Sequence, residues 1–366
     1  MVINGEIREK STKAPCLLSA IPIELEITQK AQMSANMFAR LKMAYAIKLQ
    51  NLLNEKLELK TSLRSDGELL IVYEDFVFVI RIKAPNQIQQ SYALQKYLAI
   101  VGIHNQCFSG LCTVVKKWLA SQFLAKSIDE TIVDIILATL FSTADSAAEN
   151  KTESPITVEN GFLQFLKLLS FTDFSQKFLV LASDLDENSA LDKKGNKFAK
   201  LQYDFKQKRE KYPELTIISN LDWDSAWTRN LSKPYFTRLV NCARMTLHKL
   251  SNNLDFDGVL NDAFKVDEDL FDVVLVLRPF QIPSESQSGK FQGDLSSFPV
   301  VDYNPLDRFW TELVESFGEE AQFYCNDTCK IGIKFNNPDV QLAKTILEDI
   351  QILGKDLVKD VVYKRK

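Results

Sequence analysis

Two aspartates, Asp184 and Asp186, follow an apolar run at residues 178–182 whose composition is typical of a strand. Two carboxylates on a strand end can hold the two metal ions that nucleotidyl transfer requires. Such enzymes also need a Gly-Ser turn several residues before the pair, to cradle phosphates, and a third carboxylate on a later strand. Neither Asp184 nor the alternating pair Glu24 and Glu26 has such a turn before it. Solvated strand ends are therefore the preferred interpretation.

A second pair, Asp255 and Asp257, copies the first motif of haloacid-dehalogenase-like phosphatases, in which one aspartate attacks phosphorus and the other handles protons. That chemistry needs the first aspartate at the end of a buried strand. Residues 249–253 are instead polar and typical of a helix end. No convincing downstream lysine with paired aspartates is found for phosphate and Mg²⁺. The pattern favours a loop.

The cysteines and histidines also do not form a recognisable metal-binding or catalytic pattern. Cys325 and Cys329 flank a three-residue turn, but a metal would need two further soft or imidazole ligands nearby. The two histidines, His104 and His248, and the other cysteines fall at no recognisable spacing. Hairpin packing is the preferred role for Cys325 and Cys329. The sequence therefore predicts no catalytic residue, no metal ligand and no cofactor.

The composition describes an ordinary globular chain of two or three domains. It has 366 residues, of which 46% are hydrophobic and 25% charged, and a formal net charge of −4, so any nucleic-acid contact must be local. Residues 1–13 lack the apolar core of a signal peptide, and no apolar run is long enough to cross a bilayer. We expect an intracellular protein with free thiols and no membrane partner.

Charge is unevenly distributed along the chain. Residues 193–211 carry eight basic and two acidic residues, a net of +6, whereas residues 253–307 carry eleven acidic and three basic residues, a net of −8. The basic stretch also has a helical apolar side with Phe198, Leu201 and Phe205. Most charged helix faces are merely solvated, but clustered charge favours phosphate contacts. The RNA-binding candidates are Lys193, Lys194, Lys197, Lys200, Lys206, Lys208, Arg209 and Lys211.

Three blocks, at residues 1–84, 85–253 and 254–366, are predicted to position these groups. In the first block, residues 21–27 alternate like a strand and an apolar helical stripe runs to Leu52. Strand-like segments at residues 57–63 and 69–82 flank the turn pair Asp66-Gly67. This pattern predicts a small α/β unit with few strands.

The second block is mostly helical, with two short strand-like runs at residues 178–182 and 215–219. Leu111, Val115 and Trp118 share a helical face, and Ser127-Ile-Asp-Glu130 has the form of a capping box. Further helices are expected to start at Thr157 and at Ser232-Lys-Pro234.

The third block has the element order β-α-β-β-α-β, which is typical of a ferredoxin-like α+β domain. RNA-recognition motifs share this order, but they stack bases on aromatic residues of the central strands. Residues 331–334 supply no aromatic side chain, and the block is acidic. A sheet that binds protein, or that is purely structural, is the preferred hypothesis.

Longer matches carry a family resemblance. Residues 111–124 resemble a helix of the Nrap family, the nucleolar RNA-associated proteins. The pattern of that helix in the family is R-L-x-K-R-W-L-A-S-x-L-L. Residues 161–169 resemble its G-F-x-R-F-L-x-L-L helix, and Trp227-Thr228 with residues 238–244 resemble its W-T…R-L-V-x-x-A-R stretch. The closing block is similar at residues 271–275 and 317–332. The similarity covers nearly the whole chain, although residues 32–36 lack the family's usual Trp-Pro pair.

The resemblance implies fold and function. Residues 1–84 would be part of a nucleotidyltransferase-like domain, residues 85–253 its poly(A)-polymerase/OAS-like helical companion, and residues 254–366 the terminal domain. Family members are roughly three times longer, so a C-terminal fragment or a shortened gene model is expected. It also implies a non-catalytic scaffold of the nucleus and nucleolus, in the small-subunit processome. Its partners would be pre-rRNA, the box C/D small nucleolar ribonucleoprotein, an RNA-recognition-motif protein and casein kinase subunits. The alternative is an active Mg²⁺-dependent, template-independent nucleotidyltransferase.

Overall fold

The computed structural model forms two compact units, one of residues Met1–Ser91 with Phe280–Thr311 and one of Tyr92–Pro279 with Glu312–Lys366. The structure describes residues 17–18, 20–27, 35–64, 66–74, 76–84, 87–141, 154–181, 200–219, 221–223, 225–252, 262–266, 268–278, 300–301, 304–326, 329–336 and 340–364.

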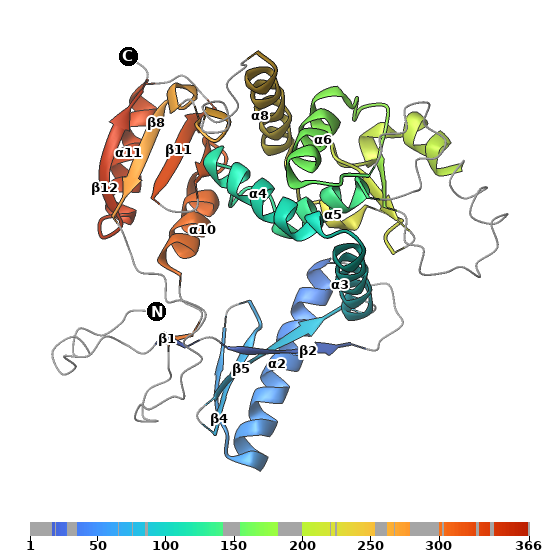
Figure 1. The fold of residues 1–366 in the computed structure, drawn as a ribbon. Helices are drawn as coiled ribbons and strands as arrows, with labels where there is room; N and C mark the ends of the chain where they lie inside the picture. Colours follow the sequence, from blue (N-terminus) through green and yellow to red (C-terminus); the bar gives the residue numbers. More distant parts are fainter. Residues whose placement is uncertain are drawn as a thin grey trace. The chain divides into compact units, whose positions relative to one another are not determined.

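The first unit contains a four-stranded sheet and a long helix (Figure 1). The sheet has the order β2-β5-β4-β3, in which β2 is parallel to β5 and the other pairs are antiparallel. A two-stranded parallel pair, β1 with β9, belongs to the same unit. The elements are β1 (Leu17–Leu18), β2 (Ile21–Glu26), α2 (Ala35–Leu57), β3 (Lys60–Leu63), β4 (Leu69–Tyr73), β5 (Phe76–Lys83) and β9 (Val300–Val301).

Helix α2 packs its apolar stripe on this sheet. Leu49 and Leu53 lie against the buried side chains of Leu69, Ile71 and Ile80. The predicted α/β unit is thus confirmed in kind, and the positive φ of 80° at Gly67 fits the predicted turn. The expected strand from residue 57 is too long, because α2 continues to Leu57 and β3 begins only at Lys60.

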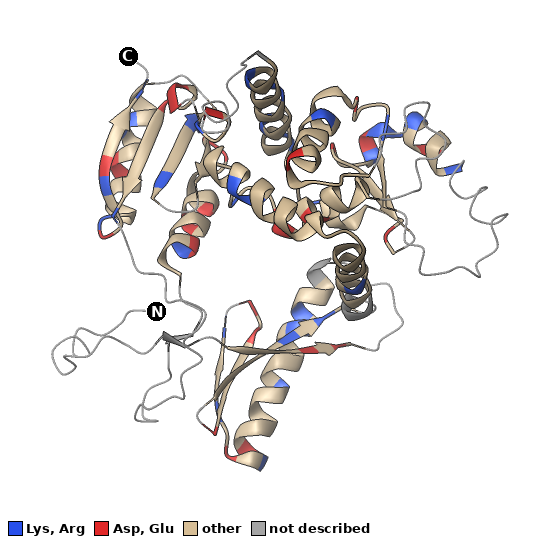
Figure 2. Ribbon diagram, viewed as in Figure 1, with Lys and Arg blue, Asp and Glu red and all other residues tan. Residues whose placement is uncertain are grey.

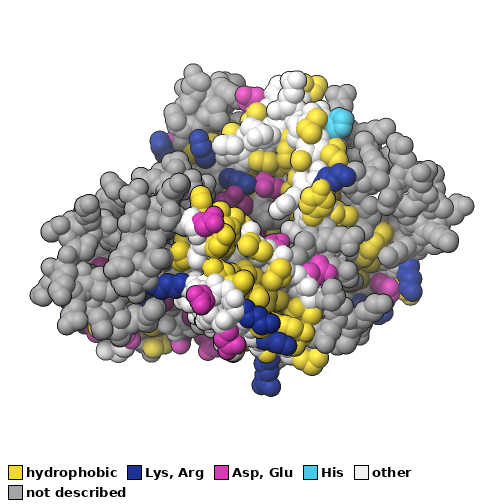
Figure 3. Space-filling model, turned by 90° about the horizontal axis from the view of Figure 1, so that it is seen from below, with side chains coloured by type: hydrophobic (Ala, Val, Ile, Leu, Met, Phe, Trp, Pro, Cys, Tyr) yellow, Lys and Arg dark blue, Asp and Glu magenta, His cyan; other side chains and the backbone are white. Residues whose placement is uncertain are grey.

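The edge strand β2 carries apolar side chains that remain exposed. Ile21, Ile23 and Leu25 alternate along the strand, so they share one face of the sheet, and all three are exposed. Figure 3 shows that hydrophobic side chains gather in the middle of the face of the molecule that it presents. The predicted alternation of this strand is confirmed, although its apolar side is not part of a buried core.

The second unit is built on helices that cross in its core, with a small parallel sheet of β6 and β7 (Figure 1). Helix α6 packs on α4 and α8, and α4 also packs on α5. Its elements before residue 272 are α3 (Gln87–His104), α4 (Cys107–Ser121), α5 (Glu130–Thr139), α6 (Val158–Phe171), β6 (Leu179–Leu181), helical residues 200–207, η2 (Arg209–Lys211), β7 (Ile217–Ser219), η3 (Ala226–Thr228), α8 (Lys233–Asn252) and η4 (Glu268–Leu270).

The expected apolar faces of these helices are buried, which confirms the helical pattern. Leu111, Val115 and Trp118 of α4 lie in one cluster with Phe162 and Phe165 of α6. No single helix among the described residues is long and apolar enough to span a membrane. The pair formed by α3 and α4, bent by 113°, meets that criterion by length and composition alone.

Two of the expected helix starts are confirmed and one is wrong, and the start expected at Ser232-Lys-Pro234 is confirmed by α8, which begins at Lys233. Thr157 caps α6, since its hydroxyl accepts a hydrogen bond from the Asn160 backbone N–H at 3.2 Å. The capping box at residues 127–130 is wrong. Asp129 is the N-cap of α5 instead, and its carboxylate accepts a hydrogen bond from the Thr131 N–H at 2.7 Å.

The terminal sheet has the order β10-β11-β8-β12, with every neighbouring pair antiparallel. Counted along the block, this is the order 2-3-1-4, which confirms the predicted ferredoxin-like topology. Its elements are β8 (Val273–Leu277), α10 (Pro305–Phe317), β10 (Ala321–Cys325), β11 (Lys330–Phe335), α11 (Val340–Leu353) and β12 (Val358–Tyr363). Cys325 and Cys329 stand at the two ends of the β10–β11 hairpin connection, as expected.

One face of this sheet is buried in the same core as the helices. Val274 and Tyr324 belong to the cluster that contains Trp118, and Val362 packs against it. Gly332 lies so close to Phe271 that a Cβ would stand 2.7 Å from the ring. Arg238 of α8 donates to the Gln122 carbonyl at 3.1 Å and lies 4.7 Å from the ring centroids of both Phe271 and Tyr324. The sheet therefore completes the helical core.

Candidate nucleic-acid interface

The described part of the basic stretch is a short helix, at residues 200–207, followed by η2. It carries Lys200, Lys206, Lys208, Arg209 and Lys211, and Figure 2 colours the basic positions of the ribbon in this segment blue. The other three candidates, Lys193, Lys194 and Lys197, lie outside the described residues.

Phe205 anchors the helix to the rest of the unit. Its side chain is buried, and its ring meets those of Phe178 and Tyr212 edge-on, each at a centroid distance of 5.2 Å. Phe178 immediately precedes β6, and Tyr212 follows η2, so the anchor joins both sides of the segment. The expected apolar side of this helix is thus confirmed at Phe205.

Arg209 is part of this anchor. Its guanidinium donates hydrogen bonds to the carbonyl oxygens of Tyr212, Phe174 and Glu214 at 2.9, 3.3 and 3.0 Å. It also lies 5.1 Å from the centroid of the Phe205 ring. These donors serve the protein's own backbone, so Arg209 has a structural role rather than the expected role of a free phosphate contact.

The lysines, in contrast, point their charge to solvent. Lys200, Lys206, Lys208 and Lys211 are exposed. Lys208 has one weak ion pair, with Asp204 at 3.4 Å, in which the lysine side chain remains 54% exposed. Exposed ion pairs of this kind contribute little and leave the cation open to other anions. The segment is therefore an anchored platform that carries exposed positive charges.

A shallow groove lies beside this platform, between the end of α6 and the middle of α8. Its lining includes Phe174 and Glu214, which Arg209 also contacts, and Arg244, whose Nε donates to the Ser170 carbonyl at 3.2 Å. Phe171 at the end of α6 is 76% exposed. We did not predict this groove from the sequence, although one pattern indicates it. Phe171 falls two residues beyond Leu169, off the apolar stripe of α6, and an aromatic residue there has no core to enter.

Of the acidic candidate catalytic residues, Glu24 and Glu26 are in the part of the chain that the structure describes. Asp184, Asp186, Asp255 and Asp257 lie outside the described residues. Glu24 is paired with Lys83 at 3.4 Å. Within the described residues, no group of three or more histidine, cysteine or acidic side chains could hold a metal ion.

The terminal sheet does not offer the open face that an RNA-recognition motif uses. Such a motif stacks bases on the sheet face opposite its helices. Here that face carries Tyr324, Gly332 and Val274, which are buried against the helical core. The sequence left two roles for this sheet, protein binding or a purely structural role. The sheet face that is buried against the helical core fits the structural role.

The helical part of the chain is similar to a poly(A)-polymerase/OAS-like domain model. Residues 105–271 match the family model described as Nrap protein PAP/OAS1-like domain 5. The chain is also 29% identical to Nucleolar protein 6 of Xenopus tropicalis over 308 residues, which cover 71% of this chain and 26% of that protein. For Nucleolar protein 6 of Xenopus laevis the identity is 30% over 244 residues, 61% of this chain and 20% of the relative. These findings support an Nrap-like relationship for the chain.

The chain spans about a quarter of the length of the curated relatives it matches. Among solved structures, it is similar to terminal uridylyl transferase 4 from Trypanosoma brucei with bound GTP, at 14% identity and a TM-score of 0.37. That likeness covers 63% of this chain and 79% of the other. The predicted fold class is confirmed: an α/β unit consistent with a nucleotidyltransferase-like fold, a PAP/OAS-like helical part and a ferredoxin-like sheet.

Proposed function

We propose that this chain belongs to the Nrap family and acts in the nucleolus as a non-catalytic scaffold that binds RNA and protein. The main support is the match of residues 105–271 to the Nrap PAP/OAS1-like domain, together with the similarity to Nucleolar protein 6. The three blocks 1–84, 85–253 and 254–366 would correspond to the remainder of a nucleotidyltransferase-like domain, its helical companion and the terminal domain.

RNA contact is proposed at the lysine platform, which we define as Lys200, Lys206, Lys208 and Lys211, with Lys193, Lys194 and Lys197 preceding it in the chain. Lysines that meet phosphates give affinity without reading sequence. Phe171 and Arg244 extend this surface with a ring on which a base can stack and a second cation. Arg209 holds the platform in place.

The proposed cellular process and the proposed partners follow from the resemblance to the Nrap family. We propose that the chain acts in early small-subunit ribosome assembly, within the small-subunit processome, on pre-rRNA with the box C/D small nucleolar ribonucleoprotein. An RNA-recognition-motif protein and casein kinase subunits are the proposed protein partners.

A second candidate function is template-independent nucleotidyl transfer with Mg²⁺. It is favoured only by the position of Asp184 and Asp186 a few residues after the buried strand β6. A pair of carboxylates without the Gly-Ser phosphate turn lacks part of the catalytic set. We therefore keep the scaffold as the leading proposal.

Crosslinking in cells tests the scaffold proposal directly. The tagged full chain is expressed in nucleated cells, located by fluorescence, crosslinked to RNA with ultraviolet light, and the bound RNA is sequenced. We expect nucleolar fluorescence and enrichment of pre-rRNA, with less RNA recovered when Lys206, Lys208 and Lys211 are all changed to glutamate. A chain that stays outside the nucleolus and recovers no more pre-rRNA than an untagged control would overturn the proposal.

A further inference from the structure

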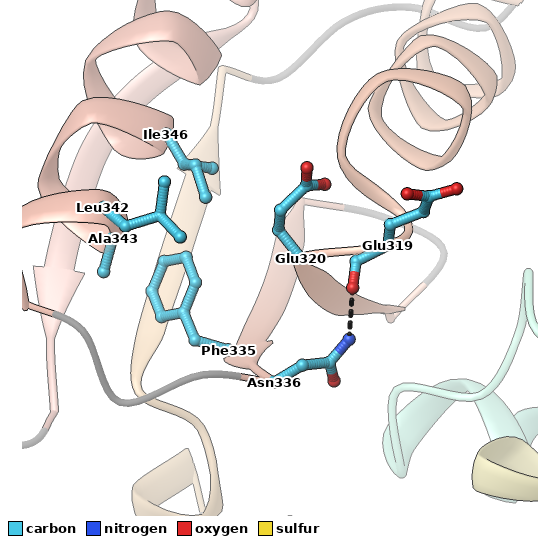
Figure 4. A pocket seen from close by; sticks show the side chains of 7 residues that line it. All are labelled: Glu319, Glu320, Phe335, Asn336, Leu342, Ala343 and Ile346. Atoms are coloured by element: carbon cyan, nitrogen blue, oxygen red, sulfur yellow. Dashed lines mark hydrogen bonds between the residues drawn. The ribbon is translucent and has the colours of Figure 1, made fainter.

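A hollow of about 300 Å³ lies on the helix side of the terminal sheet, where β11 ends and α11 begins (Figure 4). This size is at the lower end of the range for ligand pockets, so it admits one or two side chains rather than a folded domain. Its lining residues are Glu319, Glu320, Phe335, Asn336, Leu342, Ala343 and Ile346. All of them belong to the second compact unit.

The floor of the hollow is apolar. Phe335 is the last residue of β11, and Leu342, Ala343 and Ile346 come from the first two turns of α11 (Figure 4). Ile346 is buried in the sheet–helix interface, whereas Leu342 is 41% exposed. An exposed leucine next to a ring and a methyl group leaves apolar surface that gains free energy when it is covered.

The rim is polar and well ordered. Asn336 donates its side-chain N–H to the Glu319 carbonyl at 2.9 Å and its backbone N–H to the Glu320 carbonyl at 2.8 Å. Its side-chain oxygen accepts from Gln322 at 3.1 Å. These bonds fix the backbone of the turn after α10. Among the described residues, no cation pairs with the carboxylate of either Glu319 or Glu320.

The potential at this rim is negative. Glu312 and Glu315 of α10 precede the two rim glutamates, and Figure 2 colours the acidic positions on the ribbon of α10 red. The C-terminal end of α10 adds roughly half a negative charge, and the N-terminal end of α11 removes about as much. The two full carboxylate charges therefore remain, and the exposed lysines of the adjoining elements are Lys334 on β11 and Lys344 on α11.

We propose that this hollow is a docking site for a linear segment of a partner protein, in which one large apolar side chain stands next to lysine or arginine. The apolar side chain fills the floor and the cation meets Glu319 and Glu320 at the rim. Charge complementarity indicates which segment binds here. A positively charged segment gains favourable electrostatic energy at this rim, whereas the rim repels acidic peptides and RNA phosphates. The opposite face of the sheet is closed by the helical core, so this side is the one that remains accessible.

This inference deepens the proposed scaffold role and rests on it only in requiring a protein partner. The lysine platform and the hollow are different surfaces of opposite charge. Failure of one can therefore be distinguished from failure of the other by measuring RNA binding in parallel.

The test selects short random peptides displayed on phage against the full chain at low salt. Peptides enriched by selection are then labelled, and their affinities are measured by fluorescence anisotropy. We expect a shared pattern of one Trp, Phe or Leu beside Lys or Arg. Leu342→Asp should weaken these peptides by about tenfold or more, because the apolar surface of one leucine is no longer available to the peptide. Leu353→Asp is the matched control, on the same helix with the same 41% exposure, and should change nothing.

The rim is tested by charge removal at constant shape. Glu319→Gln and Glu320→Gln should each weaken binding by about two- to fivefold, as for exposed ion pairs, and salt should reduce the difference. Glu348→Gln and Asp349→Asn on α11 serve as the matched pair. RNA affinity should be the same in all of these variants.

Three results would overturn the proposal. Selected peptides could lack the apolar–basic pattern, or bind Leu342→Asp as tightly as the unchanged chain. Alternatively, sedimentation could show a dimer of the chain that Leu342→Asp dissociates, which would assign the hollow to a second copy. If RNA binding still depends on the lysine platform in any of these cases, the scaffold proposal stands while the docking site falls.

Discussion

Trp118 donates its indole N–H to the Thr246 hydroxyl across 3.2 Å, a hydrogen bond that joins α4 to α8 in the middle of the helical core. The indole also meets the rings of Phe162 and Phe165 of α6 edge-on, at 6.1 and 5.9 Å. One side chain of α4 thus contacts two other helices, α6 and α8, that are far from it in sequence. The bond satisfies a donor that no water can reach.

We expect Trp118→Ala to destabilise the second unit by about 3–5 kcal/mol, the usual cost of removing a large aromatic residue from a core. Urea unfolding followed by circular dichroism measures this. Thr246→Val removes the acceptor at nearly constant volume and should cost about 1–3 kcal/mol, because the indole N–H is left unsatisfied. An unchanged midpoint in the alanine variant would show that Trp118 contributes little to the core.

A second prediction concerns the closed sheet face. Gly332→Ala should destabilise the protein by about 1–3 kcal/mol, since the new methyl group would stand 2.7 Å from the Phe271 ring and force it to move. Gly102→Ala in α3 is the control, because its Cβ would meet Phe108 at an ordinary 3.7 Å. Thermal unfolding compares the two. Equal stability of both variants would contradict the close packing of sheet and core.

The lysine platform predicts a particular salt dependence. Lys206→Glu, Lys208→Glu and Lys211→Glu together should weaken the binding of single-stranded RNA of any sequence. They should also flatten the plot of log affinity against log salt, by roughly 0.7 for each phosphate that the platform no longer neutralises. Filter binding across a salt series measures both quantities.

Two controls accompany this prediction. Reversing three exposed lysines elsewhere in the unit, Lys96, Lys355 and Lys359, imposes the same change of net charge and should leave the slope unchanged. Arg209→Ala should lower the melting temperature, because alanine cannot make the hydrogen bonds to three carbonyls. Equal effects of the two triple reversals would refute the assignment of the platform.

Glu268 pairs with two lysines, and we expect this pairing to make the stability of the chain depend on pH in the acid range. This carboxylate accepts a hydrogen bond from Lys330 and pairs with Lys364 at 3.1 Å, and these contacts lower the pKa of Glu268 below its ordinary 4.5, the bond to Lys330 being the largest cause. A lowered pKa in the folded state gives stability that is present above about pH 4.5 and lost as the pH falls through the folded pKa.

Glu268→Gln should therefore be less stable than the unchanged chain at pH 7, and the difference should shrink as the pH falls below about 4.5. Urea unfolding at several pH values gives both curves. Glu348→Gln, an exposed glutamate on α11, should show no such pH-dependent difference. A difference that stays constant from pH 7 to pH 3 would mean that ionisation of Glu268 does not support its pairing with the two lysines.

We expect no nucleotidyl transfer by this chain. Labelled ATP with Mg²⁺ or Mn²⁺ and an RNA primer provides the assay, read on a sequencing gel. Primer extension that disappears in Asp184→Ala would overturn the scaffold proposal in favour of the enzyme, because contaminating activity does not depend on that carboxylate.

Much of the fold could be predicted because its patterns are local. The burial of Phe162, Phe165 and Leu169 follows from helical spacing, and the order of strands and helices in the last block predicts the ferredoxin-like topology. Errors occurred where two local rules compete. At Ser127 the capping pattern is present, but Asp129 lies closer to the first free N–H groups and captures the cap.

Long-range packing could not be predicted from such patterns. Arg209 looks like every other cation of the basic stretch, and only the approach of the Phe174 and Glu214 carbonyls distinguishes it. The apolar composition of β8 indicates that both of its faces are buried, but it does not indicate that Phe271, just before the strand, meets Arg238 of α8. The hollow at Phe335 likewise depends on where α11 begins relative to the end of β11, which no residue pattern fixes.

The burial of Tyr324 and Val362 against the core of the helices also has a consequence for biosynthesis. During translation, α4, α6 and α8 leave the ribosome long before these last strands are synthesised. Until then, the apolar side chains of the helices that the strands cover remain exposed. Non-local contacts of this kind slow folding, and a waiting intermediate is open to aggregation and to chaperones. Translation of the final strands therefore completes the helical core, and a polypeptide terminated before Tyr324 would be recognised as unfinished by its exposed interior.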